Sequence, residues 1–223
     1  MNTIAEITTI CFDIDWTLVK HSDDIENNVL RKLGLAPNEE FNNQVRYFWD
    51  NLSKKLQNGE KVERNKIYSL ASEMIPFLSK INLSAEDWFA LSDTVDNVEL
   101  IDGAHEVLDY LHNQGYYIVA STNWFAIDQI KVLKNLGILD FFERVYGWDT
   151  ICAKPHRNAL CSLMDIHLSD SIVFIGDSVY NDISFANKTG IKSIGFNLKY
   201  ERKSKHIKPT MHINDLLEIK KIL

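Results

Sequence analysis

The sequence predicts an α/β protein in which an open parallel sheet is interrupted, after its first strand, by an all-helical insert. Three observations support this fold class. An apolar, β-branched run opens the chain at residues 7–14. From residue 22 to residue 92 strand patterns are absent, and apolar residues recur at helical spacing. From about residue 100 strand and helix patterns alternate, which is typical of a parallel sheet covered on both faces.

Length and composition agree with a folded, globular protein. At roughly 150 residues per domain, 223 residues allow one large domain or a core with a smaller insert. The chain is 45% hydrophobic and 25% charged, which argues against disordered and fibrous classes. The net charge is −7 and no window concentrates Lys and Arg, so we expect no nucleic-acid partner.

The cysteines, the N-terminal residues and the longest uncharged stretch together predict a cytoplasmic protein that has no membrane partner. The three cysteines are odd in number and form no Cys-x-x-Cys pair, which predicts buried thiols in a reducing compartment. Residues 1–12 lack the basic start of a secretory signal. The longest uncharged stretch, residues 110–127, contains too many polar side chains for a transmembrane helix.

The insert is predicted as a series of helices. Apolar stripes indicate helices over residues 25–33 and 41–56, and residues 67–74 continue the pattern. Ser84, followed three residues later by Asp87, indicates a capping box for a last short helix.

The core combines the first strand with the elements after the insert. We predict a Rossmann-like open sheet from residues 1–19 and 99–223, with the helical domain at residues 20–98. Gly137 is the expected C′ glycine of a helix that contains the apolar residues Ile127, Ile130, Leu133 and Leu136. In chain order the later elements are a helix around residues 107–111, strand 116–120, helix 127–136, strands 144–146, 172–175 and 192–194, and a helix at 216–222.

In such a sheet ligands bind beyond the carboxyl ends of the strands. The first strand ends at Asp13 and Asp15, which lie on the same side if the strand persists. Two close carboxylates disfavour each other's ionised form unless a cation intervenes, so a metal ion is the simplest remedy. A pair of solvated turn acids is the alternative that these two residues alone leave open.

Polar residues also follow the next strands. Thr122 and Asn123 follow the strand at residues 116–120, where a hydroxyl and backbone N–H groups can accept an anion. Lys154 is placed to face the sheet end, with Pro155 in a first helical turn. Each signal alone is weak, because helix caps and solvated lysines are common.

The strand at residues 172–175 is followed by a more specific pattern, with one acid at its end and two polar groups a helical turn later. With this pattern the chain resembles the haloacid dehalogenase superfamily, and the insert resembles that family's α-helical cap. The four motifs occur in order as Asp13-x-Asp15-x-Thr17, Thr122-Asn123, Lys154 and Gly176-Asp177-x-x-x-Asn181-Asp182. Two positions depart from the family pattern: Trp16 stands where Gly is frequent, and Trp124 where smaller or polar residues are common.

The resemblance implies catalysis by two aspartates. Asp13 is the expected nucleophile that forms an aspartyl-phosphate, and Asp15 is the expected acid and base. Lys154 and Thr122, with Asn123, would hold the phosphoryl oxygens.

The resemblance also implies Mg²⁺. Its expected ligands are Asp13, the backbone carbonyl of Asp15, and Asp177, with Asp182 either binding through a water or orienting Lys154. We therefore expect a phosphatase for a small phosphorylated metabolite: a sugar phosphate, a nucleoside monophosphate or a phospho-organic acid. A phosphomutase is the alternative, and a dehalogenase or a silent phosphate-binding module is less favoured because the second aspartate and the full motif set suit phosphoryl transfer.

Overall fold

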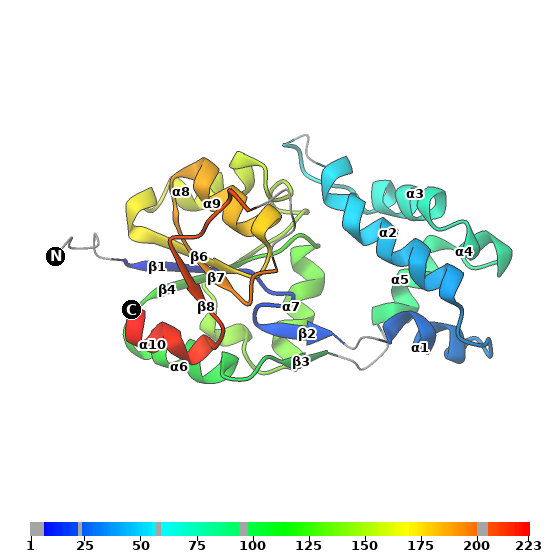
Figure 1. Cartoon of the computed structure of the whole chain (residues 1–223), viewed down its shortest axis with the longest axis horizontal. Coiled ribbons are helices and arrows are strands. Elements are labelled where there is room, and N and C mark those ends of the chain that lie inside the picture. The colour runs from blue at the N-terminus through cyan, green and yellow to red at the C-terminus, as the bar shows by residue number, and fades with distance from the viewer. Residues whose placement is uncertain (1–6, 22–23, 57–58, 94–97, 200–204) are drawn as a thin grey trace. The chain divides into compact units, whose positions relative to one another are not determined.

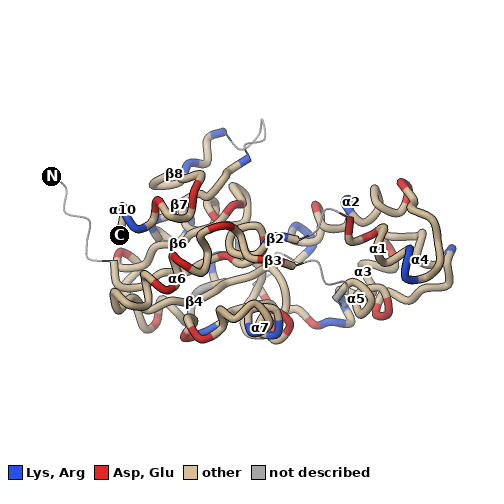
Figure 2. Tube along the Cα trace, turned by 90° about the horizontal axis from the view of Figure 1, so that it is seen from below, with Lys and Arg blue, Asp and Glu red and all other residues tan. Residues whose placement is uncertain are grey.

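The structure, a computed structural model, describes residues 7–21, 24–56, 59–93, 98–199 and 205–223. The chain divides into two compact units. One comprises residues 1–20, 57–61 and 99–223, and the other comprises residues 21–56 and 62–98. Acidic and basic residues are interspersed along the trace of both units (Figure 2). Within the described ranges, no helix combines the length and the apolar character needed to cross a membrane.

The larger unit is built on a six-stranded, all-parallel sheet (Figure 1), which confirms the predicted fold class. Its strands run in the order β5-β4-β1-β6-β7-β8. The central strand β1 pairs with β4 on one side and β6 on the other, which places the switch point of the sheet at the end of β1. The strands are β1 (Thr9–Phe12), β4 (Tyr117–Ser121), β5 (Arg144–Tyr146), β6 (Ile172–Gly176), β7 (Lys192–Phe196) and β8 (Met211–Ile213).

Helices cover both faces of this sheet, with α8 and α9 on one side and α6 and α10 on the other (Figure 1). The strands β1 and β6 are buried throughout, as expected for central parallel strands. Cys11 and Cys152 are buried free thiols, as predicted, whereas the side chain of Cys161 lies outside the described residues. The helices are α6 (Ala104–Asn113), α7 (Ala126–Asn135), α8 (Cys161–Met164), α9 (Ser184–Thr189) and α10 (Ile219–Ile222).

The smaller unit is helical, as the insert's apolar spacing predicts. Its core is aromatic, with Phe48 and Trp88 centred 5.9 Å apart and Trp88 and Phe89 4.5 Å apart. The Asp87 N–H donates to Ser84 Oγ at 3.0 Å, which is one of the two hydrogen bonds of the predicted capping box, while the Asp87 carboxylate accepts from Ser84 Oγ at 2.6 Å. Its helices are α1 (Ile25–Lys32), α2 (Glu39–Lys55), α3 (Arg64–Met74), α4 (Phe77–Lys80) and α5 (Ala85–Asp93).

The short strands and the start of one helix differ from the sequence prediction. The strands β2 (Val19–His21) and β3 (Val98–Leu100) form a two-stranded sheet where the chain passes between the units. These strands and β8, none of which the sequence predicts, have only three residues each. Pro155 lies in a turn, and the helical residues begin later with the 3₁₀ turn Arg157–Leu160. The predicted roles of the two units as core and cap stay a prediction.

Candidate active site

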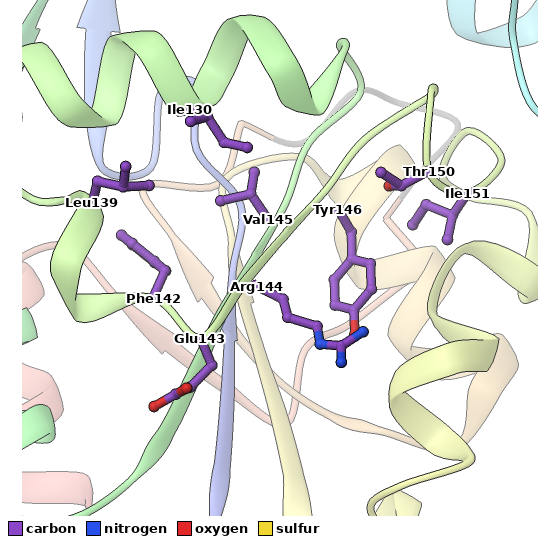
Figure 3. Close-up of a pocket in the computed structure, with 9 residues that line it drawn as sticks. All are labelled: Ile130, Leu139, Phe142, Glu143, Arg144, Val145, Tyr146, Thr150 and Ile151. Carbon is purple, nitrogen blue, oxygen red and sulfur yellow. The ribbon is translucent and has the colours of Figure 1, made fainter.

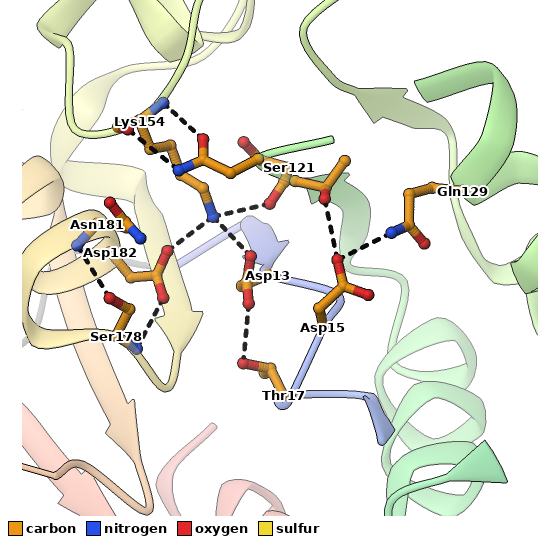
Figure 4. Close-up of polar contacts among 11 residues, drawn as sticks. Asp13, Asp15, Thr17, Ser121, Gln129, Lys154, Ser178, Asn181 and Asp182 are labelled. Atoms are coloured by element: carbon orange, nitrogen blue, oxygen red, sulfur yellow. Dashed lines mark hydrogen bonds and ion pairs between the residues drawn. The ribbon is translucent and has the colours of Figure 1, made fainter. Parts of the chain in front are cut away.

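The carboxyl edge of the sheet brings Asp13, Lys154 and Asp182 into direct contact (Figure 4). Asp13 follows β1, and its N–H donates to the Ile175 carbonyl at 2.8 Å, which fixes it beside β6. The Lys154 Nζ donates to Asp13 Oδ1 at 2.6 Å, to Asp182 Oδ1 at 2.7 Å and to the Ser121 carbonyl at 3.0 Å. Because Lys154 is only 1% exposed, these contacts replace its hydration.

Lys154 stays charged in this environment. Burial lowers its pKa, but the neighbouring Asp13 and Asp182 carboxylates together raise it by more, so the net shift of the pKa is upward. The pKa of Asp13 is raised well above its ordinary value, chiefly by burial and then by the charge of Asp182, while Lys154 opposes the rise. The site therefore combines a stable ammonium with an Asp13 carboxylate whose ionised form is destabilised.

An acidic cluster suited to a divalent cation surrounds this ion pair. Carboxylate oxygens of Asp13, Asp177 and Asp182 lie within 4.8 Å of one another. Burial, and then the charge of Asp182, raises the pKa of Asp177 to about 7. When all three carboxylates are ionised, they carry more negative charge than one ammonium balances, and a cation would relieve this excess. Carboxylate oxygens are ligands that Mg²⁺ prefers, so the residues fit the predicted ion.

Asp182 is held in place by the turn that follows β6. This turn is a π-helix, Val179–Ile183, a rare conformation that is frequent at functional sites. The Ser178 N–H donates to Asp182 Oδ2 at 2.9 Å, so both oxygens of Asp182 contact protein donors. Gly176 makes this approach possible, because a Cβ at that position would lie 2.5 Å from Asp182 Oδ2.

Asp15 has a different set of partners. Its Oδ2 accepts hydrogen bonds from Gln129 Nε2 at 2.8 Å and from Thr122 Oγ1 at 3.3 Å. Figure 4 shows its carboxylate turned toward Gln129, while Asp13 faces Lys154. The strand ends at Phe12, so the alternation that would place both aspartates on one side does not continue. The side chain of Asp15 is not among the acidic cluster.

The side chains of Asn123 and Asp149 fix the backbone around the site through hydrogen bonds. The Asn123 side chain pairs with the Lys154 backbone twice, accepting from its N–H at 2.8 Å and donating to its carbonyl at 3.1 Å. The carboxylate of Asp149 accepts from the Ala126 N–H at 2.6 Å and the Ile127 N–H at 3.2 Å, which caps α7. Sequence reasoning missed Asp149, because it lies 23 residues from the helix it caps.

The comparisons with known proteins agree with this geometry. Residues 10–196, most of the chain, match the family described as haloacid dehalogenase-like hydrolase. The chain belongs to this family. It is 27% identical, over 96% of its length and 95% of the relative, to a phosphoglycolate phosphatase from Nitrosococcus oceani. A second phosphoglycolate phosphatase, from Colwellia psychrerythraea, is 29% identical over 88% of this chain and 87% of its own. The predicted resemblance is confirmed, and the enzyme is a phosphatase of this family.

Solved structures of the family share the fold. The HAD-hydrolase YfnB from Bacillus subtilis, bound to magnesium, has a TM-score of 0.78 at 21% identity and covers 98% of this chain and 99% of its own. A predicted phosphoglycolate phosphatase from Haemophilus somnus has a TM-score of 0.68 at 22% identity, with 97% of both chains covered.

Trp16 is one of the two departures from the family pattern. Its backbone conformation explains why glycine is frequent at this position. Its φ is +66°, in the left-handed region that glycine enters most readily. The turn is closed by the Trp16 N–H, which donates to the Val19 carbonyl at 2.6 Å, and its indole is exposed. Trp16 therefore keeps the glycine geometry, and the departure leaves the turn after Asp15 intact.

A hollow of about 500 Å³ lies beside β5 and α7, outside the acidic cluster (Figure 3). None of its lining residues belongs to the predicted site, and it is not part of the arrangement around Lys154. It is lined by Ile130, Leu139, Phe142, Glu143, Arg144, Val145, Tyr146, Thr150 and Ile151.

Proposed function

We propose that this phosphatase hydrolyses a small phosphorylated metabolite with Mg²⁺, through an aspartyl-phosphate on Asp13. The observation that carries the proposal is the buried Asp13 carboxylate, held by Lys154 beside an acidic cluster at the switch point of the sheet. Phosphoglycolate phosphatases match nearly the whole chain, so a short phosphorylated carboxylic acid is the preferred substrate class. Sugar phosphates and nucleoside monophosphates are the other two classes to compare.

In the first step an Asp13 oxygen attacks the phosphorus atom. The bond between phosphorus and the ester oxygen breaks, and that oxygen leaves with the electron pair and takes a proton from Asp15. Lys154 and Thr122 donate hydrogen bonds to the phosphoryl oxygens, over which the charge of the transition state is spread. Thr122 already contacts Asp15, which supports placing the acid beside the phosphoryl group.

In the second step a water molecule attacks the phosphorus atom of the aspartyl-phosphate, and Asp15 takes a proton from it. The bond between phosphorus and the Asp13 oxygen breaks, which releases inorganic phosphate and restores the Asp13 carboxylate. Asp15 returns to its protonated form, so the cycle closes without another reactant.

Asp13, Asp177 and the backbone carbonyl of Asp15 are the residues that would hold Mg²⁺. When bound, the ion neutralises the carboxylates and the anionic phosphoryl group. We assign Asp182 to orienting Lys154, since both of its oxygens contact protein donors. Asn123 would act in the same way, by fixing the Lys154 backbone.

The test is a phosphate-release screen over phosphoglycolate, sugar phosphates and nucleoside monophosphates, in Mg²⁺ and in a chelator. We expect many turnovers with at least one monoester in Mg²⁺ and loss of activity in the chelator. Full activity in the chelator would remove the metal from the proposal. If release stopped near one equivalent per enzyme while an isomerised phosphate accumulated, the phosphomutase alternative would replace hydrolysis.

A further inference from the structure

Gln129 is a buried amide on an otherwise apolar helix face. It is 4% exposed and shares the buried face of α7 with Ala126 and Leu133. Two apolar residues of the same helix are instead exposed: Ile127 is 55% exposed and Ile130 is 38% exposed. The position therefore calls for an apolar side chain, yet it holds one of the most polar neutral residues.

The amide is only half satisfied by hydrogen bonds. Its Nε2 donates to Asp15 Oδ2 at 2.8 Å, and its Oε1 is buried without a partner among the described residues. When Asp15 is ionised, the opposite orientation of the amide would set the Gln129 carbonyl oxygen against a carboxylate oxygen, and both are acceptors. A buried, unpaired carbonyl lowers stability, so packing does not account for Gln129.

The contact to Asp15 does account for it. Two donors meet the same Asp15 oxygen, and the Gln129 bond at 2.8 Å is shorter than the Thr122 bond at 3.3 Å. Gln129 lies on a regular helix whose first turn is capped by Asp149. The helix therefore fixes the backbone position from which the Gln129 side chain extends. Figure 4 shows it reaching from α7 to the side of Asp15 that lies away from Lys154.

We propose that Gln129 is a positioning residue that holds the Asp15 carboxylate beside the phosphoryl site, retained for catalysis although it lowers stability. The inference rests on the proposed function, because it requires Asp15 to act as the acid that protonates the leaving group. Gln129 does not touch the substrate, and it acts only through the orientation of Asp15.

The test compares Gln129→Met, which keeps side-chain length but removes the donor, with Leu133→Ala, which disturbs the same face of α7 without touching Asp15. The measured quantity is kcat/KM, which depends only on the steps up to and including the first irreversible step. Two substrates are used: p-nitrophenyl phosphate, whose weakly basic leaving group does not need an acid, and the alkyl monoester that the wild-type enzyme hydrolyses fastest.

For Gln129→Met we expect kcat/KM to fall about 10- to 100-fold with the alkyl monoester, because Asp15 becomes a carboxylate as it gives up its proton and that developing charge loses one donor. With p-nitrophenyl phosphate we expect a change below about 3-fold, because no acid is needed there. The melting temperature should equal or exceed that of the wild type. For Leu133→Ala we expect a lower melting temperature and the same ratio between the two substrates as in the wild type.

Equal losses with both substrates, or a melting temperature lowered as far as in Leu133→Ala, would show that Gln129 is structural and overturn the inference. Both results leave the wild-type activity, and thus the proposed function, intact. A wild-type enzyme that hydrolyses neither monoester would instead overturn the proposed function and the inference together.

Discussion

Lys154 shows how one residue can set the chemistry of a buried site. Its ammonium has three donors, and all three are used, by Asp13, Asp182 and the Ser121 carbonyl. A phosphoryl oxygen that binds Lys154 must therefore take the place of one of these acceptors. We expect the phosphoryl oxygen to replace Asp13 as an acceptor of Lys154, because the Asp13 oxygen forms the new bond to phosphorus in the proposed first step.

Asp13→Asn should abolish turnover and leave the fold intact. An amide keeps the shape of the carboxylate but is a poor nucleophile, so we expect a loss of roughly 10⁴-fold or more. Stability should change by no more than about 1–2 kcal/mol, because the amide oxygen can still accept from Lys154 Nζ and Asp182 keeps its ion pair with Lys154. Phosphate release and circular dichroism measure the two effects.

Asp170→Asn is the matched control, since it makes the same chemical change at an exposed position. It should leave both measurements unchanged. Near-normal phosphate release by Asp13→Asn would exclude the aspartyl-phosphate route.

Among elements, the turn after β6 positions the site most directly. It depends on Gly176, where a Cβ would lie 2.5 Å from Asp182 Oδ2. Gly176→Ala should lower stability by about 1–3 kcal/mol through overpacking. It should also lower kcat about 10-fold or more, because displacing Asp182 moves the Lys154 ammonium.

Gly115→Ala provides the control for this prediction. Gly115 has a φ of +81° and open space around it, so alanine there strains only the backbone, by about 1 kcal/mol. Thermal unfolding and phosphate-release rates should show that both variants are less stable and that only Gly176→Ala loses activity. Full activity of Gly176→Ala would mean that the turn tolerates a shifted Asp182.

The elements also show which parts of the structure the sequence could predict. Buried parallel strands are runs of apolar residues, so the polar residues at their ends, such as Asp13 and Asp177, stand out. The sequence predicts the helix α7, but its apolar residues do not reveal its buried face, because Ile127 and Ile130 are exposed while the polar Gln129 is buried. Its partner Asp15 is 114 residues away, and no local period encodes such a contact.

At the scale of the whole molecule, the acidic cluster links the protonation of the site to the stability of the fold. The pKa of Asp177 is about 7 in the folded, metal-free protein because of burial and the charge of Asp182, whereas an unfolded Asp titrates near 4. Between these values the folded state binds a proton that the unfolded state has released. The free energy of unfolding therefore decreases as pH rises from about 4 to about 7.

Mg²⁺ should reverse this trend, because it binds the ionised carboxylates of the folded state and stabilises that state by mass action. We expect the melting temperature in a chelator to fall across this pH range, and the gain from added Mg²⁺ to grow as pH rises. Asp177→Asn should flatten the fall in the chelator and remove most of the gain, since the cluster loses both a titrating group and a charged ligand. Thermal unfolding at several pH values measures both effects. If the melting temperature changed with pH in the same way with and without Mg²⁺, the ion would not bind at these carboxylates.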